Sequence, residues 1–214
     1  INNPDEQELF QETQKKYNSL LHIEEEFSNL FKHIKYYNPS FLAPDVITIL
    51  SNIDYTYRTI YTDNLLLISL DVYLGGDHPF YSDYPSYIRK NNTDERIVVD
   101  VASNIINSTI SFSNNRSFLA KMIHEGKKMY LLDLYLPSKS DPIKIGYSKD
   151  KFDWATINEE QVWRYFIEND LLYSTDTQLN KRFIENAPFS KFYLSEDTKS
   201  PGRIGQWIGW QIVR

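Results

Sequence analysis

The segment His124-Glu125-Gly126-Lys127-Lys128 carries the residue types and spacing with the most specific chemical meaning in this 214-residue chain. In zinc peptidases, a helix of the form H-E-x-x-H places two histidines one turn apart as metal ligands, and its glutamate acts as the general base. His124 and Glu125 match the first two positions, but Lys128 stands where the second histidine would be. Because an ammonium is a poor ligand and repels a divalent cation, His124 would need two further protein ligands to hold zinc.

A second interpretation is that this pattern arose by chance. His124 would then be a surface histidine, and Glu125 would pair with a lysine one helical turn away. The other histidines add little support for a metal site, because His22 and His33 lie too far apart on one predicted helix to share a metal. No spacing rule brings His78 to His124. The motif alone therefore leaves both interpretations open.

The elements that would position this segment follow from hydrophobic periodicity, which predicts an α+β chain. Residues 116–132 are the predicted helix that carries the motif. Three short β-branched and aromatic runs predict an antiparallel meander with Asp54 and Asp63-Asn64 at its turns. The third run is apolar almost throughout, which predicts a central strand covered on both faces. The predicted strands are 46–49, 55–61 and 65–73.

Helices dominate the remaining sequence. One long helix is predicted first, over residues 5–36, because apolar residues recur there at helical spacing. Proline and polar residues predict loops at 139–150 and 188–200, and Ser200 is a plausible cap for the last helix, with Pro201 in its first turn. The further predicted helices are 94–107, 158–172, 176–187 and 201–214.

Glycine is scarce, yet it recurs in the predicted helices near the motif and at the end of the chain. Gly202, Gly205 and Gly209 are three of only 7 glycines, and Gly126 is a fourth. Helical glycine costs about 1 kcal/mol relative to alanine, so repeated use indicates a packing requirement. Gly205 and Gly209 lie one turn apart and leave one helix face clear, whereas Trp207 fills another. We therefore expect the last helix to approach a neighbour closely, at Gly126.

Composition narrows the class of protein. The net charge of −6, with basic residues never in a run longer than a pair, argues against nucleic-acid binding. The chain has no cysteine, which excludes disulfides, a cysteine zinc site and a cysteine nucleophile. No apolar run is long enough to span a bilayer.

The length of the chain fits a single domain over 1–214. The start at Ile1 and the end at Arg214, inside a predicted helix, suggest that a targeting segment and the extreme C-terminus lie outside this sequence.

Four segments together resemble the gliding motility lipoprotein family of the GldB type, and the similarity covers nearly the whole chain. The terminal segment, which contains Gly202, Arg203 and Trp207, is the most specific of them. The segments are 71–81 (DVYLGGDHPFY), 84–88 (YPSYI), 122–130 (MIHEGKKMY) and 200–213 (SPGRIGQWIGWQIV).

The resemblance implies a Bacteroidetes lipoprotein that is anchored in a membrane through an N-terminal lipid and faces the periplasm. It also implies a link to gliding motility and its associated secretion machinery, with an envelope protein as the partner. The family is in turn similar to predicted H-E-x-x-H zinc proteases, which implies a zincin-like arrangement of the helices. This chain departs from that group at Lys128, and Glu185 is the downstream carboxylate to consider as a relic third ligand beside His124.

Three functions follow as hypotheses. The first is a peptidase-derived, non-catalytic domain that acts by binding a protein in the cell envelope and holds no cofactor. The second is an active metal-dependent hydrolase with a divergent site, which uses His124, Glu125 and a remote residue as a further zinc ligand. The third is a glycan-binding module, since tyrosine and tryptophan side chains can stack on sugars. Metal content after purification without a chelator would separate the first two.

Overall fold

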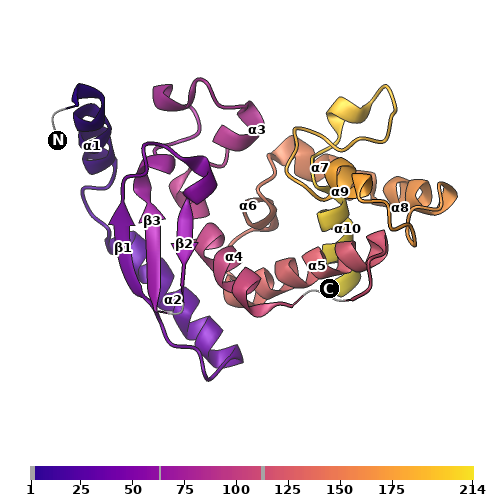
Figure 1. The fold of residues 1–214 in the computed structure, drawn as a ribbon, viewed down its shortest axis with the longest axis horizontal. Helices are drawn as coiled ribbons and strands as arrows, with labels where there is room; N and C mark the ends of the chain where they lie inside the picture. Colours follow the sequence, from indigo (N-terminus) through magenta and orange to yellow (C-terminus); the bar gives the residue numbers. More distant parts are fainter. Residues whose placement is uncertain (1–2, 63, 112–113) are drawn as a thin grey trace. The chain divides into compact units, whose positions relative to one another are not determined.

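The chain folds as helices with one small sheet, which confirms the predicted α+β class (Figure 1). It divides into two compact units. The first unit comprises residues 1–108 and 134–137, and the second comprises residues 109–133 and 138–214. That residues 1–214 form one domain stays a prediction. The computed structural model describes residues 3–62, 64–111 and 114–214.

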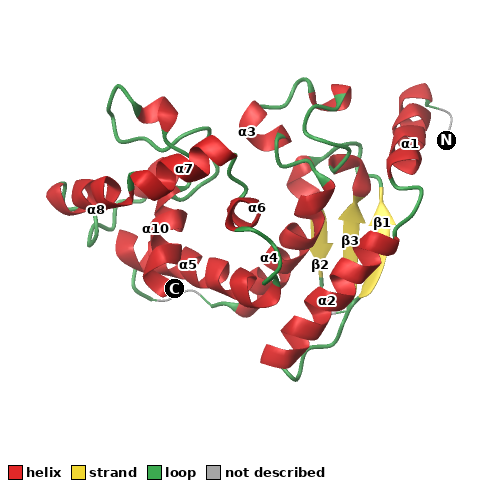
Figure 2. Ribbon diagram, turned by 180° about the vertical axis from the view of Figure 1, so that it is seen from behind, coloured by secondary structure: helices red, strands yellow, loops and turns green. Residues whose placement is uncertain are grey.

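In the first unit, α2 lies across one face of a three-stranded sheet, as seen from both sides in Figures 1 and 2. The strands are β1 (Asp45–Ile49), β2 (Thr59–Tyr61) and β3 (Leu65–Ser69). The helices of this unit are α1 (Pro4–Lys16), α2 (Leu21–Tyr37), α3 (Ser86–Arg89) and α4 (Ile97–Thr109).

The predicted antiparallel meander is wrong, because the sheet is mixed. β3 lies in the centre, as predicted, and Leu67 pairs with Ile47 of parallel β1 and with Ile60 of antiparallel β2. Tyr55–Tyr57 is a 3-10 helix rather than part of a strand. The carboxylate of Asp71 accepts backbone N–H bonds at Ser51 and Ile53, which turns the chain away from a hairpin after β1. Asp63, a predicted turn former, lies outside the described residues.

The third predicted strand is also shorter than expected. β3 ends at Ser69, and residues 70–72 form a 3-10 helix. Within β3, Leu66 and Ile68 are fully buried, whereas Leu65 and Leu67 are half-buried. The continuous apolar run therefore joins a central strand to a buried turn, and an apolar pattern alone does not separate the two.

The predicted helix over 5–36 is wrong, since α1 and α2 are separate helices. Tyr17 ends α1 with a non-helical backbone, and its hydroxyl donates a 2.7 Å hydrogen bond to the carbonyl of Tyr73. Its ring packs against a small buried cluster that includes Leu9 and Tyr81. Because this contact fixes Tyr17 to a distant segment, the chain turns at residues 17–20 although the hydrophobic periodicity continues.

The second unit is helical. The predicted loop over 139–150 is wrong, because it contains α6 and the start of α7. Pro142 lies in the first turn of α6, where its missing N–H removes no helical hydrogen bond, and Gly146 ends the helix at φ +71°. The described helices are α5 (Phe118–Tyr135), α6 (Asp141–Ile145), α7 (Lys149–Ile157), α8 (Glu159–Glu168), α9 (Gln178–Phe183) and α10 (Ile204–Val213).

Several predicted helix ends also differ. α8 ends at Glu168 rather than 172, and α9 is shorter than the predicted 176–187. The last helix begins at Ile204, and Arg203 precedes it in the left-handed conformation at φ +60°. Ser200 does not cap this helix, because its hydroxyl bonds to the backbone of Ser190 and Asp197 instead.

Candidate functional site

α5 carries the motif and begins where its sequence provides a cap. The hydroxyl of Ser117 accepts a 3.3 Å hydrogen bond from the backbone N–H of Ala120. The next residue, Phe118, is fully buried; its ring packs edge-on against Phe166 at 5.2 Å between centroids and lies tilted against Phe183 at 5.7 Å. These contacts fix the start of α5 against α8 and α9.

The close approach predicted for the terminal glycines is present between α5 and α10. A Cβ added to Gly126 would lie 2.0 Å from the carbonyl oxygen of Gly209. A Cβ added to Gly209 would lie 1.8 Å from the carbonyl oxygen of Met122, and one on Gly205 would lie 2.9 Å from that of Phe183. These distances leave no room for a side chain, so α10 is in backbone contact with α5 beside the motif and with the end of α9 at Gly205.

Lys128 and Glu125 form an ion pair one turn apart, with 2.8 Å between Nζ and Oε1. Both side chains are about four-fifths buried, at 20% and 19% exposure. His124 is buried at 5% exposure, so the expectation of a surface histidine under the chance interpretation is wrong. Burial first, and the nearby ammonium of Lys128 second, hold the pKa of His124 below its ordinary value of 6.5. The site therefore combines an imidazole whose protonation is disfavoured with a carboxylate that is paired with an ammonium.

Glu185 lies beyond the end of α9 with an exposed side chain. Lys128 is paired with Glu125, and among the described residues no group of three or more histidine, aspartate or glutamate side chains is placed to hold a metal ion. In the first unit, His78 lies 3.7 Å from a carboxylate oxygen of Glu12. The structure thus brings together Glu125 and Lys128, next to His124, and a role for Glu185 as a relic ligand stays a prediction.

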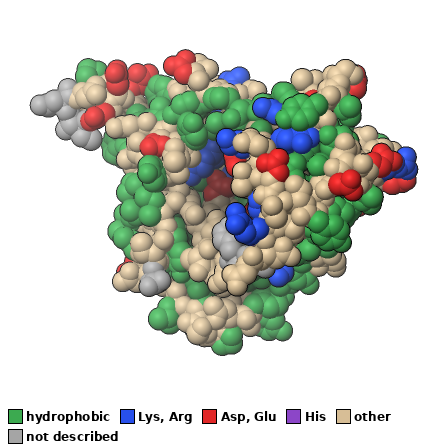
Figure 3. Space-filling model, turned by 45° about the vertical axis from the view of Figure 1, so that its right-hand side comes forward, with side chains coloured by type: hydrophobic (Ala, Val, Ile, Leu, Met, Phe, Trp, Pro, Cys, Tyr) green, Lys and Arg blue, Asp and Glu red, His purple; other side chains and the backbone are tan. Residues whose placement is uncertain are grey.

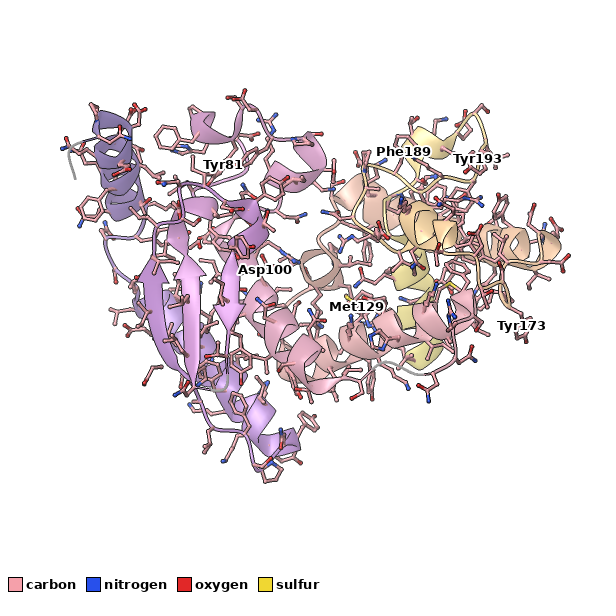
Figure 4. All side chains as sticks on the ribbon, in the orientation of Figure 1. Tyr81, Asp100, Met129, Tyr173, Phe189 and Tyr193 are labelled. Atoms are coloured by element: carbon pink, nitrogen blue, oxygen red, sulfur yellow. The ribbon has the colours of Figure 1, made fainter. Side chains whose placement is uncertain are left out.

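The other predicted residues of the terminal segment are packing residues. A Cβ on Gly202 would lie 2.0 Å from the carbonyl oxygen of Ala187. Arg203 donates hydrogen bonds to Gln206 at 3.2 Å and to the carbonyl of Ile145 at 2.5 Å. Trp207 packs edge-on against Phe152, with ring centroids 5.2 Å apart. Figure 4 labels Met129 on α5, the helix that carries the motif.

The sequence prediction missed a charged cluster around Asp133, on the same helix as the motif. Its carboxylate accepts hydrogen bonds from Lys144 at 2.8 Å, Trp210 Nε1 at 2.9 Å and Arg214 at 2.9 Å. Burial acts to raise the pKa of Asp133, but these donors outweigh it and hold the pKa below the ordinary value. The partners lie 11, 77 and 81 positions away, so no local spacing reveals them.

Comparison with known proteins gives one result that covers the chain. The family model described as gliding motility protein GldB matches residues 1–214. No curated protein and no solved structure matches the chain. None of the helices in the described part of the chain is both long and apolar enough to cross a membrane. The matched family implies an envelope-associated lipoprotein with a role linked to gliding motility. The chain therefore belongs to the gliding motility protein GldB family.

Proposed function

We propose that this chain is a peptidase-derived domain that has lost its metal and acts in the cell envelope by binding a protein. The observation that carries this proposal is the Lys128–Glu125 ion pair, at 2.8 Å, at the position where a second histidine would complete H-E-x-x-H. The ammonium engages the carboxylate that would act as the general base, and its positive charge opposes binding of zinc. In this proposal the arrangement of helices descends from a zincin-like fold, with His124 and Glu185 as relics of the ligand set.

The proposal extends to location and partners. The domain would face the periplasm of a Bacteroidetes cell and be held at a membrane by a lipid. Its partner would be an envelope protein that takes part in gliding motility or in the linked secretion machinery. Binding rather than hydrolysis would then be its contribution, without a cofactor.

Metal content tests the proposal. Wild-type protein purified without chelator is expected to contain much less than one equivalent of zinc, and His124→Ala is expected to leave this unchanged. Lys128→His is expected to bind zinc more tightly than the wild type, because it restores two imidazoles at i and i+4. Lys127→His is the matched control, since it adds an imidazole on the same helix outside that spacing.

Two results would contradict the proposal. Stoichiometric zinc in the wild type that disappears in His124→Ala, together with peptide hydrolysis that is abolished in Glu125→Gln, would establish the divergent hydrolase instead. Equal zinc binding by Lys128→His and Lys127→His would remove the support for peptidase descent.

A further inference from the structure

A groove of about 430 Å³ runs beside α8 in the second unit, away from the motif residues on α5. One wall is the face of α8 that carries Gln161, Tyr165 and Glu168, and the other is the loop over residues 192–200. The groove is lined mainly by apolar groups, among them Trp154 and Phe192. This size and lining fall in the range of sites that bind ligands, which are mostly apolar with a few polar groups.

The walls of the α8 groove are held in place by contacts within the unit. The hydroxyl of Tyr165 donates a 2.8 Å hydrogen bond to the carbonyl of Phe192, and the two rings meet edge-on at 5.0 Å. At the far end of the loop, Lys151 Nζ donates to the carbonyls of Thr198 and Ser200 at 2.7 and 2.8 Å. A groove that is already ordered loses less conformational entropy on binding, which favours affinity.

The 192–200 loop also exposes apolar side chains at the rim of the groove. Leu194, which lines the groove, is 59% exposed, and the adjacent Tyr193 is 76% exposed. Tyr193 is labelled in Figure 4 on this loop, and Figure 3 shows that exposed hydrophobic side chains lie among charged ones on the face it draws. Apolar side chains around a preformed groove are typical of interaction sites.

The charges around the groove favour a basic ligand. The lining lysine and arginine are each in an ion pair with an acidic neighbour, Lys199 with Glu196 and Arg164 with Glu160. In the described part of the chain, Glu168 has no ion-pair partner, so its negative charge is uncompensated at one end of the groove.

Asp197, which also lines the groove, is already used by the loop itself. Its carboxylate accepts hydrogen bonds from the backbone N–H groups of Tyr193 and Leu194 at 2.9 and 3.2 Å. Glu168 is thus the carboxylate available to a ligand.

We propose that the α8 groove docks a short extended segment of a partner protein, whose apolar side chain enters the groove while a lysine or arginine two residues further along, on the same face of the segment, faces Glu168. The distance from Gln161 to Glu168 along α8 is about 10 Å at 1.5 Å per residue, which matches three residues of extended chain at about 3.3 Å each. This inference rests on the proposed role in protein binding and names the surface and the class of segment.

Two peptides that differ at one residue, and so by two units of charge, test the proposal: acetyl-Leu-Gly-Lys-Gly-amide and acetyl-Leu-Gly-Glu-Gly-amide. Each is titrated into the ¹⁵N-labelled chain to about 5 mM, since so short a segment is expected to bind in the millimolar range. The lysine peptide is expected to shift the Trp154 indole and the amides of Gln161 and Leu194, and to bind at least about threefold more tightly than the glutamate peptide.

Variants of the chain assign the effect to the groove. Glu168→Gln is expected to lower affinity for the lysine peptide about threefold, as for loss of an exposed ion pair. Leu194→Ser is expected to weaken binding of both peptides. Glu25→Gln on α2, which removes the same charge from an exposed site outside the groove, is expected to change neither affinity.

The proposal is overturned if neither peptide shifts the groove signals, if both bind equally, or if the shifts fall elsewhere on the chain. It is also overturned if maltotriose shifts the same signals at lower concentration, which would identify a glycan site. These outcomes are separate from the zinc experiments, because hydrolysis at His124 would overturn the proposed function and leave binding in the α8 groove intact.

Discussion

Lys128 determines the chemistry of the motif, because its ammonium acts on both neighbours at once. It pairs with Glu125 at 2.8 Å, and it is the second cause, after burial, of the lowered pKa of His124. A zinc ion in this position would likewise neutralise the glutamate and keep the imidazole deprotonated. The lysine therefore supplies a positive charge beside both Glu125 and His124.

The lowered pKa of His124 predicts how stability depends on pH. Because the native state binds this proton less readily than the unfolded chain, the free energy of unfolding should fall as pH decreases below about 6.5. One such group gives a slope of at most about 1.4 kcal/mol per pH unit. Urea denaturation of the wild type and of His124→Gln between about pH 5 and 8 measures this, and the variant should lose that part of the slope.

A second pair of variants tests whether Lys128 contributes to the lowered pKa of His124. Lys128→Met should raise the pKa of His124 in an NMR titration, whereas Lys121→Met, on the same helix, should change it less. Equal shifts in both variants, or an unchanged pH slope in His124→Gln, would contradict the account of this site.

Among the helices, the charged cluster at Asp133 connects α5 to α6 and to the end of α10. Lys144, the partner on α6, has a side chain only 5% exposed. Asp133→Asn would remove the carboxylate 2.8 Å from that ammonium and leave Asp141, at 3.8 Å, as a more distant one, so it should lower the free energy of unfolding by about 3 kcal/mol. The double variant Asp133→Asn/Lys144→Met should recover much of this loss in urea denaturation. Equal instability of the single and double variants would show that the lysine charge is not the cause.

The contact of α5 with α10 makes glycine necessary at Gly209. Alanine in a helix is normally more stable than glycine by about 1 kcal/mol. Here the added methyl would lie 1.8 Å from the backbone of Met122, so Gly209→Ala should destabilise by several kcal/mol, of order 3 or more. Thermal denaturation measures the change, with Ser28→Ala, at an exposed position of α2, as the control that should be neutral or slightly stabilising. A stabilised Gly209→Ala would refute the close crossing.

For the helices and strands, the sequence predicts those features that depend on residues close together in the chain. Periodicity located α5 and α4, and the scarce glycines indicated the close crossing at Gly126, because both signals lie within one or two turns of helix. The break after Tyr17 and the direction of β1 depend on partners far along the chain, at Tyr73 and Asp71. Hydrogen bonds of this kind leave no spacing pattern, so the long helix and the antiparallel meander were predicted in their place.

The division into two units raises the question of whether the whole chain unfolds as one domain, as its length predicts. All four tryptophans lie in the second unit, so their fluorescence reports that unit alone. Far-UV circular dichroism reports the helices of both units. If residues 1–214 are a single cooperative domain, urea transitions followed by the two signals should coincide. A fluorescence transition displaced from the circular dichroism transition would show that the units unfold separately.

Gly209→Ala gives a second test, because it destabilises the second unit directly. If the chain is one domain, the variant should shift both transitions together. If it is two domains, part of the circular dichroism change should remain at the wild-type urea concentration.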